Sequence, residues 1–516
     1  MKNSLILLIF SFICLSPVSA GSYDSEFDFM YGASFTFQNG IPFVRVHIKT
    51  YNSGLEIKDI SSISCNGHDY PADSVTLNVK SFFPAEVKYK LVFTELSMSE
   101  IKNYESIILK WNESAKVSTE VYVHGAIFSI NASRIDNREY FIALPGLLDK
   151  AGSEKTLEKY RKMFPENNIF LIPVLTKTAD SEISVKTSKG ETVNCRKIVF
   201  IKNNNAAQMS AGNDKYSGIN SFFITASSDS KLELAGEDSV ENLIQKILPG
   251  EMFLSAPLET LKAQAVAART DIFMQLGKRH VAEPWHICSE VHCQKVLWNT
   301  KIDQKFNDAV KQTDGQIILY DGSYIARAPY CSSSGGRTEN IMNVWFTAEK
   351  PYLSGVWDGD IPPALDLTKE SDFEKFLDSD FGEDNIPMNK KHRWTVEFSQ
   401  NEIDALLEKS LNIGKLKKIN ALKRGTSGRI FKIEFIGDIS SQTVYGELNI
   451  RRLLKNMYSS AFIVKNENGK WVFRGAGWGH GVGMSQIGAI SLGKKGHDFK
   501  YMLKRYYPGT EVVKIY

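Results

Sequence analysis

The chain has 516 residues, of which 43% are hydrophobic and 23% charged, a composition typical of a globular protein. Its formal net charge is only +3 and its cations form no basic stripe, so composition gives no support to nucleic acid as a partner. The length predicts more than one domain.

The first twenty residues have the pattern of a secretory signal peptide. Lys2 precedes an apolar run at 5–15, and the small residues Ser19 and Ala20 supply a cleavage site. The run is too short to cross a bilayer about 30 Å thick with ease, although an uncleaved membrane anchor is the alternative. We expect residues 1–20 to be removed and the protein to be exported to the periplasm, the cell wall or the extracellular space.

Removal of the signal would leave an odd number of cysteines in an oxidising compartment. They are Cys65, Cys195, Cys288, Cys293 and Cys331. Complete internal pairing is therefore excluded, and either a thiol stays free or some of the cysteines bind metal.

Residues 21–202 have the pattern of a β-rich region. Runs that alternate β-branched and polar residues are separated by turn residues, at 42–48, 74–79, 89–93, 106–111, 120–130 and 195–201. The polar stretch 203–218 predicts a loop or linker. Because helical and strand patterns mix beyond it, the predicted fold class is α+β, with the β-rich region preceding a mixed domain.

The clearest helix is predicted from residue 258 onward, where the chain is rich in alanine. Its apolar residues keep a spacing of three and four that places them on one face, at Leu258, Leu261, Ala265, Ala268 and Ile272. Ser255 is expected to cap this helix, with Pro257 and Glu259 in its first turn.

Charged residues near this helix suggest chemistry. Lys262 and Arg269 are seven residues apart, so both are expected to project from a second face. Glu251 follows Gly250 in a predicted turn that presents it to a cleft. The alternative is a surface helix with solvated charges.

Several motifs follow one another in an order that resembles one known family. PGEM (249–252) and LKAQAVAARTD (261–271) are followed by PYCSSSGGRTENIMNVWF (329–346), FRGAGWGHGVGMSQIGA (473–489) and YYPGT (506–510). Together they resemble the stage II sporulation protein D (SpoIID/LytB) family of peptidoglycan-acting proteins, over residues 215–516. Asp271 departs from the pattern, because the family usually has an aromatic residue there.

The resemblance implies an exported lytic transglycosylase acting on peptidoglycan glycan strands. It would cleave the bond between N-acetylmuramic acid and N-acetylglucosamine and form a 1,6-anhydro end. Glu251 matches the catalytic acid of the family. The alternative is a non-catalytic wall-binding protein that recruits or enhances an amidase, as in the regulatory branch, with other cell-wall hydrolases or amidases as partners.

The resemblance also suggests where the glycan binds. Lys262 and Arg269 match basic residues of the family's active-site helix, and we expect them to bind glycan. Gln264 is expected either to bind sugar or to pack the helix. The remaining expected contacts are Ser332, Ser333 and Ser334 in a glycine-rich loop, for which a plain turn is the alternative, and Trp478 and His480. A buried structural role is the alternative for His480.

The segment 280–294 contains two cysteines and three histidines. Some family members bind zinc through two cysteines and one histidine near the catalytic glutamate. We expect structural zinc at Cys288 and Cys293, with His286 favoured over His292 as the histidine ligand. A Cys288–Cys293 disulfide and free thiols are the alternatives.

Overall fold

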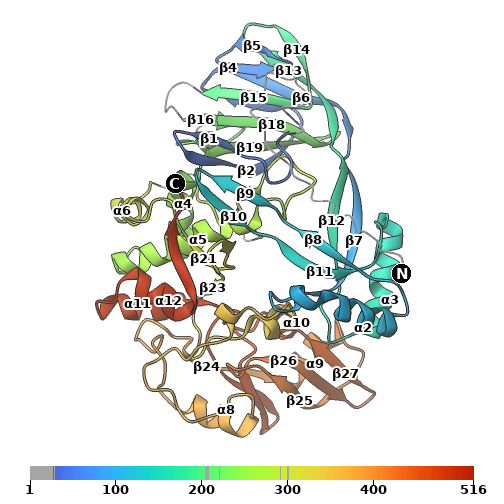
Figure 1. The fold of residues 1–516 in the computed structure, drawn as a ribbon, viewed down its shortest axis with the longest axis vertical. Helices are drawn as coiled ribbons and strands as arrows, with labels where there is room; N and C mark the ends of the chain where they lie inside the picture. The colour runs from blue at the N-terminus through green and yellow to red at the C-terminus, as the bar shows by residue number, and fades with distance from the viewer. Residues whose placement is uncertain (1–26, 28, 204–207, 220, 291, 299–300) are drawn as a thin grey trace, which may run out of the picture.

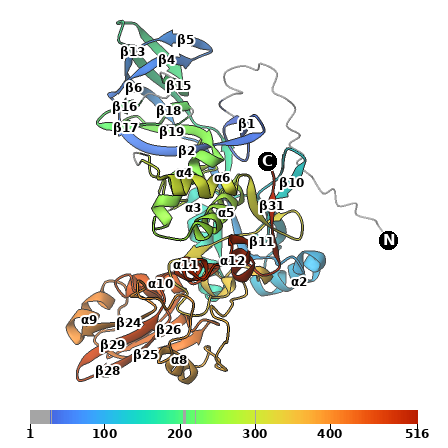
Figure 2. The ribbon, with the colours of Figure 1, turned by 90° about the vertical axis from the view of Figure 1, so that its left-hand side faces the viewer.

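The computed structural model describes residues 27–516 except 28, 204–207, 220, 291 and 299–300. The predicted signal peptide therefore lies outside the described residues. Figures 1 and 2 show an upper β lobe, a middle region of packed helices and a lower lobe along the long axis. The fold is α+β with a β-rich N-terminal region, as predicted. Among the described residues, no helix has both the length and the hydrophobicity needed to span a membrane.

The upper lobe packs one β-sheet against another. The first sheet runs, in spatial order, β1 (Thr36–Gln38), β2 (Ile41–Asn52), β19 (Lys231–Ser239), β18 (Ser221–Ser228), β15 (Ile198–Asn203), β4 (Ile60–Cys65) and β5 (His68–Pro71). The second runs β14 (Thr192–Arg196), β13 (Asp180–Thr187), β6 (Ser74–Phe83), β3 (Leu55–Lys58), β16 (Met209–Ala211) and β17 (Asp214–Tyr216). Alternating residues such as Ile63, Leu77 and Ile183 form the shared core.

A disulfide joins the two sheets of this lobe. It links Cys65 at the end of β4 to Cys195 in β14. Cys288, Cys293 and Cys331 are free thiols. Pairing is thus incomplete, as the odd count requires, and the alternative of a Cys288–Cys293 disulfide does not hold in this structure.

The predicted linker at 203–218 is wrong for its described part. Residues 209–216 form the hairpin β16–β17, and β16 pairs with β3. Met209 and Tyr216 are buried in the core of the upper lobe, and only residues 212–213 form the hairpin turn. Because β19 then pairs with β2, strands from both sides of the predicted linker share one sheet.

A smaller sheet, here called the side sheet, lies beside the middle region (Figure 1). Its strands are ordered β12 (Phe170–Lys177), β7 (Glu86–Glu95), β11 (Glu139–Ala143) and β8 (Glu120–His124). It packs against α2 (Tyr104–Ala115) and α3 (Lys150–Met163), and a short 3-10 helix spans Glu100–Asn103. The strand predicted at 106–111 is wrong, because Tyr104, Ile107, Ile108 and Trp111 are spaced for one helical face that packs on Phe93.

The middle region is built around α5 (Leu258–Gln275), the helix predicted from sequence. Its predicted apolar face lies in a core shared with α4 (Val240–Glu251) and α6 (Gln304–Gln312). Glu259 is in the first turn as expected. The predicted cap is wrong: Pro257 occupies the N-cap position, and Ser255 is exposed further upstream, because the fixed φ of proline begins the helix after it.

The other elements of the middle region cover α5. One sheet runs β31 (Thr510–Lys514), β21 (Gln316–Tyr320), β22 (Tyr324–Ile325), β10 (Ser133–Asp136) and β9 (Ile127–Ile130). The short strands β23 (Tyr330–Cys331) and β30 (Met484–Ser485) pair in parallel, and β20 (Ile287–Cys288) pairs with β2. The helices here are α7 (Ile341–Trp345), α11 (Gln486–Lys494) and α12 (Phe499–Tyr506), with a 3-10 turn at Pro351–Leu353.

The lower lobe has its own core of aromatic and aliphatic side chains. One sheet runs β24 (Arg393–Ser399), β29 (Lys470–Ala476) and β28 (Phe462–Glu467), and another runs β25 (Leu416–Arg424), β26 (Ile430–Gly437) and β27 (Ser441–Tyr445). Its helices are α8 (Glu370–Leu377), α9 (Gln400–Glu408) and α10 (Glu447–Leu453). The glycine-rich motif around His480, at residues 473–489, is here called the glycine-histidine motif. Because β29 leads directly into its glycine-rich part, the lower lobe positions that motif.

The disulfide is expected to stabilise the upper lobe. It closes a sequence separation of 130 residues, and cross-links of this kind typically contribute about 2–4 kcal/mol. A Cys65→Ala, Cys195→Ala double variant should therefore unfold at a lower temperature than the oxidised protein, measured by circular dichroism. A reductant should lower the transition of the parent protein but leave the variant unchanged. Equal transitions for all samples would contradict the prediction.

Candidate functional site

Glu251 is the last residue of α4 and is half-buried. The helix begins with the side chain of Ser239 accepting a hydrogen bond from the Asn242 amide, and it ends where the Met252 amide donates to the Leu248 carbonyl. Burial raises the pKa of the Glu251 carboxyl group, a hydrogen bond from Gln486 lowers it, and the nearby charge of Asp271 raises it further. The result is a raised pKa, as acid catalysis requires.

Asp271 is the second carboxylate beside Glu251, and it comes from α5. Its Oδ2 accepts hydrogen bonds from the side-chain amides of Gln275 and Gln294, the latter at 3.0 Å. Burial raises the pKa of Asp271, although Arg279 and the two amides act against the shift. Two carboxyl groups with raised pKa values therefore interact electrostatically. In the sequence, Asp271 is only a departure from the family pattern.

Three further polar side chains lie with these two carboxyl groups: Gln264, Tyr330 and Gln486. We call the five residues the Glu251 cluster. The Gln486 side chain donates to the Glu251 carbonyl at 3.2 Å and lies 3.4 Å from the Gln264 side-chain oxygen. Burial and then the charges of Glu251 and Asp271 raise the pKa of Tyr330, which also bonds with Gln264. Gln264 is fully buried, so it packs the helix rather than facing a sugar.

The two predicted glycan-binding cations do not lie in this cluster. Arg269 is 0% exposed, and its guanidinium donates to both carboxylate oxygens of Glu241 at 2.7 and 2.8 Å and to the Gln316 carbonyl at 3.0 Å. Lys262 pairs with Glu259 at 2.7 Å and lies over the ring of Phe499. The prediction that Arg269 binds glycan is wrong, because α5 is buried on nearly every side and the guanidinium is fully paired inside.

The serine loop also differs from the prediction. Ser333 and Ser334 are buried, and their hydroxyl groups donate to Asp384 and to Asp358 respectively, the second at 2.6 Å. Ser332 is half-buried, and its carbonyl accepts from the Ile487 amide at 3.1 Å. Ser333 and Ser334 therefore fasten the loop internally rather than offering their hydroxyl groups to a sugar.

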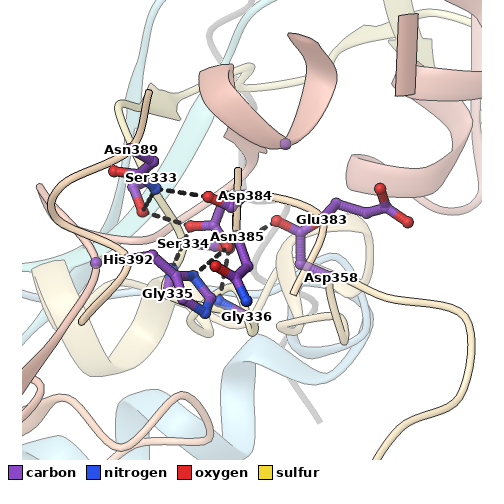
Figure 3. Close-up of polar contacts among 12 residues, drawn as sticks. Ser333, Ser334, Gly335, Gly336, Asp358, Glu383, Asp384, Asn385, Asn389 and His392 are labelled. Carbon is purple, nitrogen blue, oxygen red and sulfur yellow. Dashed lines mark hydrogen bonds and ion pairs between the residues drawn. The ribbon is translucent and has the colours of Figure 1, made fainter. Parts of the chain in front are cut away.

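Figure 3 shows Asp384 between this loop and His392. The Asp384 carboxylate accepts from the Gly335 amide at 2.8 Å and lies 3.0 Å from His392 Nδ1. Burial and the neighbouring Asp384 raise the pKa of Asp358 to about 7. Asp358, Asp384 and His392 lie in irregular segments, and no sequence motif marks them as functional. They connect the serine loop to the lower lobe.

The glycine-histidine motif approaches other chain segments closely. Gly477, Gly479, Gly481 and Gly483 all have positive φ angles, which glycine adopts without steric cost. A Cβ at Gly481 would lie 2.3 Å from the guanidinium carbon of Arg429, which is itself buried. The bare backbone therefore makes room for an internal arginine.

His480 is half-buried within this motif rather than exposed. Its Nδ1 accepts from the Val482 amide at 3.0 Å, and its ring lies 4.9 Å from that of Trp345. Burial, then the charges of Arg429 and Arg451, lowers its pKa to about 3, so it is neutral. The structural role therefore fits His480 better than the expected contact with glycan.

Trp478 does present an aromatic surface. Its side chain is 48% exposed and contacts the ring of Tyr458 edge-on. Its backbone pairs with Ser333 in both directions, at 2.9 and 3.1 Å. Trp478 is thus an exposed aromatic side chain on a rigid support, as a sugar contact requires.

A candidate metal centre lies beyond the C-terminal end of α5. One ligand atom each from His280, Cys288, His292 and Cys293 lies within 4.8 Å of the others. The separations are 3.3 Å for His280 Nε2 to Cys293 Sγ, 3.5 Å for Cys293 Sγ to His292 Nδ1 and 3.8 Å for Cys288 Sγ to His292 Nδ1. Two sulfur and two nitrogen donors at such distances fit a tetrahedral zinc site.

His286 is not part of this centre, contrary to prediction. It is 1% exposed, and its Nδ1 accepts from the Arg45 amide at 3.1 Å. Its Nε2 lies 2.6 Å from the Ser34 carbonyl oxygen and 2.7 Å from an Arg45 guanidinium nitrogen. Both ring nitrogens are occupied, so His280 and His292 take the place that sequence reasoning gave to His286.

Comparisons with known proteins agree with this location of the site. The family model described as "Stage II sporulation protein" matches residues 228–320, which include Glu251, Asp271 and the metal centre. A second model, described as a domain of unknown function (DUF8618), matches residues 339–483, which include the lower lobe.

Relatives resemble about half of the chain. It is 29% identical over 297 residues to an amidase enhancer of Bacillus subtilis, covering 52% of this chain and 40% of that protein. It is 28% identical over 296 residues to stage II sporulation protein D of the same organism, covering 53% of this chain and 76% of that protein. An uncharacterized protein of Brachyspira hyodysenteriae is 28% identical over 286 residues, covering 54% of this chain and 68% of that protein.

The matched part of the chain begins in the last strands of the upper lobe and includes α4, α5 and the metal centre. The motifs and the relatives agree with this match, so residues 228–320 are similar to the stage II sporulation protein family.

Proposed function

We propose that this protein is an exported peptidoglycan lytic transglycosylase with Glu251 as its acid and base. The observation that carries the proposal is the half-buried Glu251 carboxyl group, whose pKa is raised at the end of a fixed helix beside Asp271. The names of the relatives support a role at the cell wall. The exposed ring of Trp478 supplies a surface for a sugar ring.

The proposed reaction needs one carboxyl group and no water. Protonated Glu251 donates its proton to the oxygen between C1 of N-acetylmuramic acid and C4 of N-acetylglucosamine, and the C1–oxygen bond breaks. The Glu251 carboxylate then takes the proton of the muramoyl C6 hydroxyl group. The C6 oxygen forms a bond to C1, which closes the 1,6-anhydro ring and returns Glu251 to its protonated state.

The zinc that we propose at His280, Cys288, His292 and Cys293 would be structural. It would fix the segment that contains Gln294, whose side chain donates to Asp271 at 3.0 Å. Burial is the main cause of the raised pKa of Glu251, and the charge of Asp271 adds to it. The metal centre would thereby position residues of the Glu251 cluster without contacting the glycan.

A second candidate function is that of a wall-binding protein which enhances an amidase. It is favoured by the name of one relative. It is also favoured by the serine loop, because the hydroxyl groups of Ser333 and Ser334 are already bonded to Asp384 and Asp358 and are not available to a substrate. Glu251 would then not be needed for enhancement of the amidase. An amidase assay with and without the purified protein separates this function from glycan cleavage.

A Glu251→Gln variant should lose glycan cleavage by about 10²–10⁴-fold, because the amide cannot donate the proton. Release of soluble fragments from purified peptidoglycan measures this, and co-sedimentation should show that the variant still binds the wall. Glu349→Gln, at an exposed glutamate, is the matched control and should keep full activity. Equal cleavage by both variants would exclude Glu251 as the acid.

Activity should fall as pH rises through the raised pKa of Glu251, because only the protonated carboxyl group is an acid. Asp271→Asn removes a negative charge that raises this pKa. The loss of kcat/KM should therefore begin at a lower pH in this variant, as measured by a pH profile. Asp229→Asn, at an exposed turn residue, should leave the profile unchanged. An unshifted profile for Asp271→Asn would contradict the electrostatic argument.

The purified protein should contain one zinc ion per chain, measured by inductively coupled plasma mass spectrometry. A Cys288→Ala, Cys293→Ala double variant should contain none and unfold at a lower temperature. Cys331→Ala changes a buried free thiol outside the centre and should retain the metal. Zinc-free protein from zinc-supplemented cultures would overturn this assignment.

A further inference from the structure

A cavity of about 660 Å³ lies where the side sheet meets the middle region. Its size is within the range of ligand sites, roughly 300–1,000 Å³. Phe170 and Asn168 line it from the side sheet and the loop before it, and Asp271 and Gln275 line it from α5. The side sheet spans 86–177 and so lies outside both matched family models.

The cavity adjoins the Glu251 cluster. Asp271 belongs to both, and Pro329, another lining residue, directly precedes Tyr330 of the cluster. His292 of the candidate metal centre also lines the cavity. A ligand in the cavity would therefore extend toward the proposed reaction centre.

Buried ion pairs hold the walls of the cavity together. Glu139 of the side sheet pairs with Lys278 at 3.2 Å and with Arg327. Glu95 of the same sheet pairs with Lys350 at 2.6 Å. The cavity is thus preformed, because separating its walls would leave these charges buried and unpaired.

The same ion pairs decide the chemistry of the ligand. Lys278 and Arg327 are cations of the lining, and two carboxylates of the same lining act on both: Glu139, which pairs with each of them, and Glu95, whose charge raises the pKa of each. His124, also in the lining, is neutral because burial lowers its pKa to about 4. An acidic ligand therefore finds little free positive charge inside, apart from exposed Arg279.

The lining instead offers aromatic faces and hydrogen-bond acceptors. Phe170 is half-buried and contacts Phe141 edge-on, and Trp345 also lines the cavity. Glu95 Oε2 and Gln275 Oε1 are buried and, among the described residues, have no hydrogen-bond partner. These acceptors suit a ligand with hydroxyl and amide N–H groups, and they would repel a carboxylate.

We propose that this cavity binds an uncharged N-acetylhexosamine part of a glycan strand, with sugar rings against Phe170 and Trp345. The proposal rests on the proposed function, because it assigns the side sheet to the same substrate. The N-terminal region would then be part of the substrate-binding site rather than a separate module.

The test measures binding without cleavage. Glu251→Gln protein is titrated calorimetrically with a β-1,4-linked tetramer of N-acetylglucosamine. When Phe170→Ala is combined with Glu251→Gln, the tetramer should bind about tenfold more weakly or worse. Combining Asn168→Ala with Glu251→Gln should weaken binding to a smaller extent. Phe83→Ala, at a phenylalanine 64% exposed on β6 of the upper lobe, is the matched control and should leave binding unchanged. Circular dichroism checks that each variant is folded.

Each outcome decides between alternatives. Tetramer binding that is absent, or that is equal with and without Phe170, would overturn the proposal. Binding of an acidic stem peptide that competes with the tetramer and depends on Phe170 would overturn the assignment to an uncharged sugar. If the parent protein binds the tetramer through Phe170 yet cleaves no glycan, the cavity assignment holds and the proposed enzymatic function fails.

Discussion

The structure of the middle region depends on one charge pair in its core. Arg269 is 0% exposed, and an unpaired guanidinium there would cost about 3–5 kcal/mol. Glu241, in the first turn of α4, supplies the partner and also accepts from the Gly315 amide at 3.3 Å and the Tyr516 hydroxyl group at 2.5 Å. The pair thus fixes α4 against α5, β21 and the chain end, and it holds Glu251 at the other end of α4 in place.

The Glu251 cluster is supported from several directions by groups that touch no substrate. Gln294, next to Cys293 of the candidate metal centre, holds Asp271, and Asp271 raises the pKa of Glu251. On the opposite side, Gln486 at the start of α11 bonds the Glu251 carbonyl. These supports come from different parts of the sequence, so the raised pKa of Glu251 is a property of the assembled fold and not of its local motif.

Sequence patterns predicted the features that depend on the spacing of residues close together in the chain. The helix from residue 258 and its apolar face are confirmed. Long-range partners could not be predicted. No local pattern indicates that Arg269 pairs with Glu241, which lies 28 residues before it. Likewise, none indicates that His286 contacts Ser34 and Arg45 in distant segments. Residues 106–111 read as a strand because only a wider window, from Tyr104, reveals the helical spacing.

The central claim is that Glu251 cleaves glycan without consuming water. The most direct measurement digests purified peptidoglycan in water enriched in oxygen-18 and analyses the fragments by mass spectrometry. The account predicts 1,6-anhydro-muramoyl ends that contain no heavy oxygen. Reducing ends that carry oxygen-18 would contradict it, and would instead identify a hydrolase in which Asp271 is the nearby second carboxylate to examine.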